Sequence, residues 1–174
     1  MLANPVSGER MRFVQTAADT GGCLLEWDHI LAPGARVPAE HIHRVQQERF
    51  EVLAGTARVR CARDSFDLHE GESVVIPAGT RHGLRNDTGE QVTVRCQLRP
   101  AMRTAEYFEL VCALAVQGKV SRRGIPSPLR GAVILVELGQ QDYLPAVPIV
   151  VQQGLLAALA WTGRCLGVRA RLTT

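Results

Sequence analysis

Two stretches decide how this chain folds: HIHRVQQERFEVLAG at residues 41–55 and GESVVIPAGTRHGLRN at residues 71–86. Side chains alternate between the two faces of an extended strand, so His41 and His43 should project from the same face, about 6–7 Å apart. Glu48 opens the run that follows, and His82 comes just after the sharp corner predicted at residues 77–79. We therefore expect these four side chains to converge on one metal ion.

The chemistry of these donors narrows the choice of ion. Three imidazoles and one carboxylate favour a transition metal over calcium or magnesium, because those two ions prefer shells made only of oxygen. The donors suit iron, manganese, nickel and zinc, so the sequence predicts one divalent transition metal per chain without naming it. An ion that accepts five or six ligands would keep one or two positions for a substrate or dioxygen.

Short runs of alternating apolar and polar residues predict further strands on both sides of the two stretches. Residues 10–16 and 24–31 form the first predicted strands, and residues 92–98 alternate in the same way until Pro100. The pair Ala54-Gly55 predicts a tight hairpin turn. About eight short strands separated by turn residues indicate an antiparallel sheet that is closed or sandwiched.

The two stretches resemble the two sequence motifs of the cupin superfamily. In the first motif His41, His43, Glu48 and Gly55 stand at the family's spacing, whereas Gly34 precedes them by one residue too many. The second motif is met at every position, by Gly71, Pro77, Gly79, His82 and Asn86. The resemblance covers approximately residues 20–100 and leaves the last part of the chain outside it.

This resemblance implies a mainly β fold, in which an antiparallel jelly roll (a double-stranded β-helix) occupies residues 1–100. It implies that His41, His43, Glu48 and His82 hold the metal and that Asn86 serves a structural turn. Similar metal-dependent proteins include dioxygenases, isomerases, lyases and cyclases that act on small oxygen-bearing molecules. A homodimer is also expected, both from the resemblance and from the apolar C-terminal part of the chain.

Strand alternation predicts which side chains line the cavity around the metal. On the second strand, burial of two carboxylates would be costly, so the set that contains Trp27 and His29 should face inward. Phe50 and Val52 share the parity of Glu48. These four residues are the predicted substrate pocket. His29 is a candidate acid or base, although a hydrogen-bonded core histidine is the commoner role; no further catalytic residue is identified.

After Pro100 the apolar period changes to that of helices, which are expected at residues 104–117, 127–138 and 148–167. We expect residues 101–174 to form a helical extension that packs on the jelly roll or at a dimer interface. No charged residue occurs at positions 143–163, but two prolines and Gln152-Gln153 argue against insertion, so membrane association is not expected.

Composition limits the partners and the compartment. The formal net charge is +3, and no basic run is interleaved with aromatic residues, so we do not expect nucleic-acid binding. The 5 cysteines lack CxxC spacing and their number is odd, which favours buried, reduced thiols in a cytoplasmic protein.

Two functional hypotheses follow. The first is a metal-dependent enzyme, an oxygenase, that acts on a small oxygen-bearing organic molecule; isomerase, lyase or cyclase chemistry is the alternative within this class. The second is a sensor that binds a small ligand without turnover and signals through its helices. A purely structural metal fits less well, because the donor set would leave coordination positions free.

Overall fold

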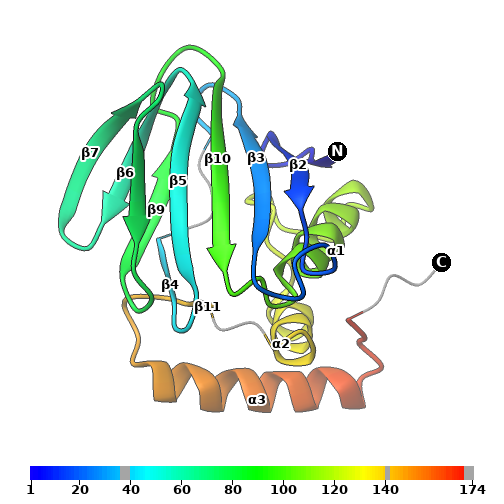
Figure 1. Cartoon of the computed structure of the whole chain (residues 1–174). Helices are drawn as coiled ribbons and strands as arrows, with labels where there is room; N and C mark the ends of the chain where they lie inside the picture. Colours follow the sequence, from blue (N-terminus) through cyan, green and yellow to red (C-terminus); the bar gives the residue numbers. More distant parts are fainter. Residues whose placement is uncertain (36–39, 140–141, 171–174) are drawn as a thin grey trace.

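The computed structural model describes residues 1–35, 40–139 and 142–170, and Figure 1 shows the arrangement of its elements. The strands are β1 (Leu2–Asn4), β2 (Glu9–Gln15), β3 (Leu25–Leu31), β4 (His41–His43), β5 (Gln47–Ala54), β6 (Thr56–Cys61), β7 (Asp64–His69), β8 (Ser73–Ile76), β9 (Arg81–Arg85), β10 (Val92–Arg99) and β11 (Asp142–Tyr143). The helices are α1 (Thr104–Val116), α2 (Pro128–Glu137) and α3 (Ile149–Cys165). All three helices predicted from the sequence are present, within about two residues at their ends.

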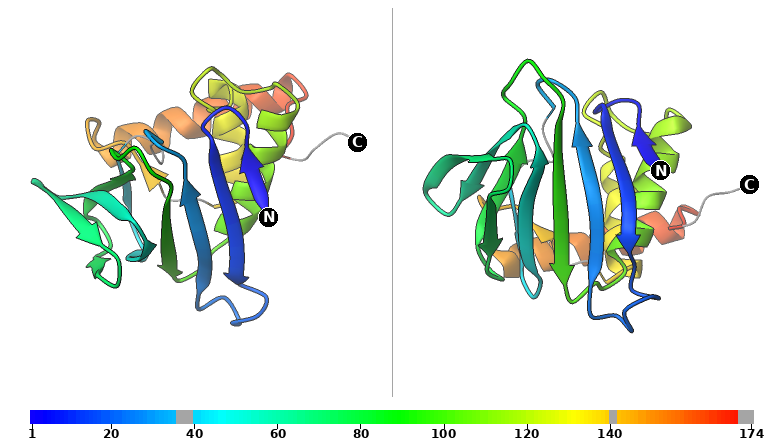
Figure 2. Two further views of the ribbon diagram at one scale, coloured as in Figure 1. Left: turned by 90° about the horizontal axis from the view of Figure 1, so that it is seen from above. Right: turned by 45° about the horizontal axis from the view of Figure 1, so that its top comes forward.

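The strands form two antiparallel sheets that face each other, as the two views in Figure 2 show. One sheet has 6 strands in the order β1-β2-β3-β10-β5-β8, and the other has 5 in the order β11-β4-β9-β6-β7. The expected mainly β jelly roll is therefore confirmed. Its core lies between the sheets, where buried residues of β5 and β10 meet those of β6 and β9.

Alternation along each strand explains which residues enter this core. On β10 the buried apolar residues alternate with half-buried polar ones, and on β6 Ala57 and Val59 are fully buried between half-buried arginines. The register between neighbouring strands places inward-facing residues side by side across the sheet. Phe50 on β5, for example, stands opposite both Cys96 on β10 and Val74 on β8. The two sheets thus bury complementary apolar faces.

The predicted hairpin at Ala54-Gly55 is wrong. Strands β5 and β6 follow one another in the chain but belong to different sheets, so the turn carries the chain across the sandwich. Gly55 adopts φ +85° in this turn, and a Cβ atom there would lie 3.1 Å from Val92 Cγ2. The positive φ and the close approach of Val92 both require glycine here. A glycine in a turn does not by itself show which strands pair.

Helix α1 covers the inner face of the six-stranded sheet near its β1 edge (Figure 1). The ring of Phe108 on α1 contacts the ring of Trp27 on β3, with centroids 5.3 Å apart. Strand β11 then returns from the helical part of the chain to pair with β4. The expected division at residue 100 stays a prediction, and residues 140–141 and 171–174 of the predicted extension lie outside the described ranges.

Helix α3 packs on α2 along one side and leaves the other side open. Ala160 and Gly163 are buried, whereas Val150, Leu155 and Trp161 are 58–79% exposed. Among the described residues, no helix is long and apolar enough to cross a membrane. The expected homodimer remains a prediction, which light scattering can check.

Gly163 allows α3 to approach α2 closely. A Cβ atom here would lie 2.8 Å from Val133 Cγ2 and 3.2 Å from the carbonyl oxygen of Leu129. We expect Gly163→Ala to lower the free energy of unfolding by about 1–3 kcal/mol, because the two helices must move apart. Gly154 lies on the same helix with open space around it, so Gly154→Ala should raise that free energy by about 0.5–1 kcal/mol. Denaturant unfolding measures the free energy of unfolding of both variants. Equal changes in the two would contradict the close packing of α3 on α2 at Gly163.

The cysteines correct one expectation from the sequence. Cys96 and Cys112 are buried as expected, but Cys23 and Cys165 are exposed, and all five thiols are free. Parity along a strand predicted the burial of Cys96, whereas Cys23 lies in a turn and Cys165 at the end of α3, where alternation carries no information.

Candidate metal centre

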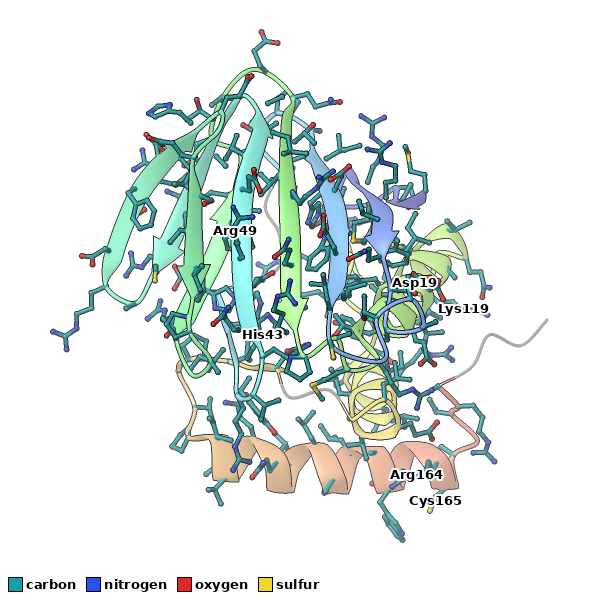
Figure 3. All side chains as sticks on the ribbon, viewed as in Figure 1. Asp19, His43, Arg49, Lys119, Arg164 and Cys165 are labelled. Carbon is teal, nitrogen blue, oxygen red and sulfur yellow. The ribbon has the colours of Figure 1, made fainter. Side chains whose placement is uncertain are left out.

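The structure brings the four predicted metal ligands together between the two sheets. His41 and His43 point inward from β4, and His82 points inward from β9, where it stands opposite His41. Glu48 comes from β5 in the other sheet, where it pairs with Leu98 and Ile76. Their ligand atoms all lie within 4.8 Å of one another. His43 lies at the end of the sheets nearest α3 (Figure 3).

The distances within this cluster suit a bound ion. His41 Nε2 lies 3.1 Å from His43 Nε2, and Glu48 Oε2 lies 3.3 Å from His43 Nε2 and 2.8 Å from His82 Nε2. Since metal–nitrogen bonds are about 2.0–2.1 Å long, neighbouring ligand atoms on one ion should lie roughly 3.0–3.5 Å apart. Small shifts of these side chains would therefore admit a transition metal.

Two buried polar atoms of the cluster support the same assignment. His82 Nε2 and Glu48 Oε2 are buried and lie 2.8 Å apart, but neither has a hydrogen-bond partner that meets the usual geometry among the described residues. Buried polar atoms rarely remain without partners, because each would lose its solvation. A cation between them would satisfy both atoms.

Burial and mutual contacts shift the pKa values of His41, His43 and Glu48. Burial lowers the pKa of His41 to about 4, with further lowering from the neighbouring His82 and His43 rings, so His41 is neutral at pH 7. Burial also opposes protonation of His43, but Asp142 and Glu48 outweigh it and raise the pKa of His43 to about 10. Although burial alone would raise it, His43 and His82 hold the pKa of Glu48 below its ordinary value. An incoming cation would displace the proton from His43.

Two hydrogen bonds orient the imidazole rings. His82 Nδ1 donates to the backbone carbonyl of Thr80 at 2.8 Å, and His43 Nδ1 donates to Asp142 Oδ1 at 2.5 Å. Both bonds leave Nε2 of the ring directed at the cluster. Metal-binding histidines commonly donate their second nitrogen to a carboxylate or carbonyl, which fixes the tautomer and increases ligand basicity.

Asp142 is the functional residue that sequence reasoning missed. It belongs to β11, whose pairing with β4 places Asp142 directly opposite His43. In the sequence the two residues are 99 positions apart, and Asp142 carries no motif. The only signal was weak: Asp142 is the last charged residue before the long uncharged segment.

The four predicted pocket residues are all buried in the core, at 1–3% exposure. Phe50 lies beside the cluster, with its ring centroid 6.3 Å from that of His82. Trp27 packs on α1 instead, and His29 Nε2 lies 3.4 Å from Glu9 Oε1 beneath the same helix. The role of these residues as a substrate pocket stays a prediction, in which Phe50 has the best position.

Asn86 takes the structural role expected from the motif. It is fully buried, and its side-chain nitrogen donates to the backbone carbonyls of Leu31, Ala32 and Glu90. Its side-chain oxygen accepts from the backbone nitrogen of Thr88. Asn86 thus ties the turn after β9 to the end of β3.

Comparison with known proteins agrees with the fold and the motifs. Residues 27–96 match the family model described as Cupin domain. Over 55 residues the chain is 42% identical to mannose-1-phosphate guanylyltransferase from Salmonella muenchen. This match covers 31% of this chain but only 11% of that protein.

Two solved structures are similar to this chain at low sequence identity, and the first of them shares its fold. A predicted oxalate decarboxylase from Thermotoga maritima has a TM-score of 0.51 and 16% identity, and the match covers 53% of this chain and 80% of that one. A Klebsiella pneumoniae protein with a double-stranded β-helix domain has a TM-score of 0.49 and 20% identity, with 57% and 84% of the two chains covered. The family match and the two sequence motifs together show that residues 27–96 form a cupin domain.

Proposed function

We propose that this chain is a metal-dependent enzyme, an oxygenase that acts on a small oxygen-bearing organic molecule. The observation that carries the proposal is the convergence of His41, His43, Glu48 and His82 within 4.8 Å between the two sheets. A bound transition ion would supply Lewis-acid polarisation of a ligand oxygen and, with iron or manganese, redox chemistry with dioxygen.

The protein's own residues would prepare this chemistry. Glu48 supplies negative charge in a buried setting, and the three imidazoles contribute neutral donors once the proton on His43 has left. Asp142 holds the His43 ring in place. Phe50 presents apolar surface beside His82 and would help to exclude water from the site. His41 is the one partly exposed member of the cluster and marks the side from which a ligand would enter.

A second candidate is a domain that binds a small ligand without turnover and passes a signal through its helices. The link between the cluster and α3 favours it. Asp142 contacts His43, and the adjacent Tyr143 accepts a hydrogen bond from Gln153 of α3 at 3.1 Å. A rearrangement at His43 would therefore reach α3, whose outer side is exposed and apolar.

One set of assays separates these candidates. The full chain is loaded separately with iron(II), manganese(II), nickel(II) or zinc(II) and mixed with enols, keto acids and dihydroxy-aromatic compounds. Oxygen consumption matched by an oxygenated product supports the oxygenase. Conversion without oxygen consumption would replace it with isomerase, lyase or cyclase chemistry, and saturable binding without any product would support the sensor. Glu48→Gln should abolish true turnover, which distinguishes it from chemistry of the free metal.

A further inference from the structure

A cavity of about 680 Å³ lies outside the metal centre. Its described lining comes from β6, β7 and β9, the β3–β4 connection, the β1–β2 turn and the loop between α1 and α2. None of the four metal-centre residues is among the described lining. On β9, His82 belongs to the metal cluster, while Gly83 and Arg85 line this cavity.

The wall of this cavity is rich in arginine. The described lining contains Arg58, Arg60, Arg85, Arg122 and Arg123, against a single carboxylate, Glu40. Glu40 is already engaged by Arg81 in an ion pair. Within the described ranges, neither Arg122 nor Arg123 has an ion-pair partner, and both are exposed at the cavity. Arg122 and Arg123 therefore give the cavity positive charge that no carboxylate among the described residues pairs with.

Two arginines of the wall stand opposite each other on neighbouring strands. Arg58 on β6 stands directly opposite Arg85 on β9. Like charges at directly opposed positions destabilise a sheet. Asp67, which stands opposite Arg58 on β7, and Asp87 offset part of this repulsion, at 2.8 Å from Arg58 and 2.7 Å from Arg85. An anion bound between the two guanidinium groups would relieve it from the cavity side.

Arg60 provides a hydrogen-bond donor that has no acceptor within the described residues. Its Nε atom is buried and makes no hydrogen bond there; Glu40 Oε1, at 3.9 Å, is beyond hydrogen-bonding distance. Arg60 stands opposite Gly83, where a Cβ atom would lie 3.3 Å from Glu40 Cγ. A larger residue at Gly83 would thus crowd the space in front of Arg60. Buried donors are normally satisfied, and the Arg60 side chain is 37% exposed, so an anion bound in the cavity would supply the missing acceptor.

We propose that this cavity binds a small phosphorylated molecule. Guanidinium groups recognise phosphate through paired, charge-assisted hydrogen bonds, and several of them converge here. The volume is in the range of cavities that hold small ligands. None of the described lining residues is aromatic, and single-stranded nucleic acids usually require aromatic platforms for their bases. The site is separate from the metal centre and does not depend on the proposed oxygenase activity.

Binding of inorganic pyrophosphate and of a hexose 6-phosphate to the full chain, measured by isothermal titration calorimetry, tests this proposal. The unphosphorylated hexose and a single-stranded oligonucleotide serve as comparison ligands. The double variant Arg122→Gln/Arg123→Gln removes two exposed charges from a loop and should weaken binding of the phosphate ligands at least tenfold. Arg164→Gln removes one positive charge from α3 (Figure 3), outside the described lining of the cavity, and should bind like wild type.

Several results would overturn the proposal. They are the absence of saturable binding to either phosphate ligand, equal affinity of wild type and the double variant, and equal weakening in Arg164→Gln. Tighter binding of the oligonucleotide would replace the ligand class with nucleic acid. Treatment with EDTA should leave phosphate affinity unchanged, and a loss of binding would place the phosphate on the metal instead. None of these outcomes depends on whether the metal centre turns over a substrate.

Discussion

His82→Ala is expected to remove tight metal binding from this protein. Wild type should contain about one divalent transition ion per chain, and the variant close to none, as measured by plasma mass spectrometry after gel filtration. His82 is 1% exposed and contributes the ligand atom nearest to Glu48. Its removal leaves three ligands, one of which is the buried carboxylate of Glu48, now with one fewer imidazole beside it.

The matched control is His69→Ala. His69 is an exposed histidine on β7 outside the cluster, and its loss should leave the metal content at the wild-type value.

Because His82→Ala also opens a cavity, Glu48→Gln tests the same site with a side chain of nearly the same volume. Metal that binds only to the folded state should raise the unfolding free energy by about 4 kcal/mol at a free concentration of 1,000 Kd. EDTA should therefore lower the thermal midpoint of wild type but not of Glu48→Gln. Full metal content in both cluster variants would refute the ligand assignment.

Asp142→Asn is expected to weaken metal affinity about 10–100-fold while leaving the saturated content at one ion per chain. The asparagine keeps the size of the side chain but cannot offer a full negative charge to His43 Nδ1, which lies 2.5 Å from Asp142 Oδ1 in wild type. The ring then becomes a weaker ligand and loses part of its orientation. Competition with a chromophoric chelator measures the affinity. Asp64→Asn, an exposed change at the start of β7, is the control and should have no effect.

A second test of the hydrogen bond between Asp142 and His43 uses the metal-free protein. His43 has a pKa raised to about 10, so its proton stabilises the fold fully below about pH 6.5. This contribution is lost as the pH rises towards 10. Asp142→Asn should lower the pKa of His43 and shift this loss to lower pH, which unfolding experiments in EDTA at several pH values would detect. If both metal affinity and the pH profile match wild type, Asp142 does not position His43.

The ligand set was predictable because it depends on strand parity and short spacings. His41 and His43 are two residues apart, and the second motif places His82 after a corner that proline and glycine define locally. The helices were predictable for a similar reason, since Ser127-Pro128 and the glycines after each helix act within one turn. Local chemistry was sufficient for these features.

Features that depend on distant pairing were not predictable. Strand β11 has only two residues and lies between α2 and α3 in the chain, so nothing in its own sequence indicates that it pairs with β4. The Ala54-Gly55 turn fits a hairpin and a crossing between sheets equally well by sequence, and only the partners of β5 and β6 distinguish them. The arginine-lined cavity likewise unites residues of the β1–β2 turn, the five-stranded sheet and the α1–α2 loop.

The central claim is that four side chains from two facing sheets bind one transition metal ion. Anomalous X-ray diffraction at the zinc edge, from crystals of the protein loaded with zinc, tests it most directly. We expect one strong peak about 2.0–2.2 Å from Nε2 of His41, His43 and His82 and from a carboxylate oxygen of Glu48. Zinc bound elsewhere, with these four side chains joined only to one another, would contradict the claim.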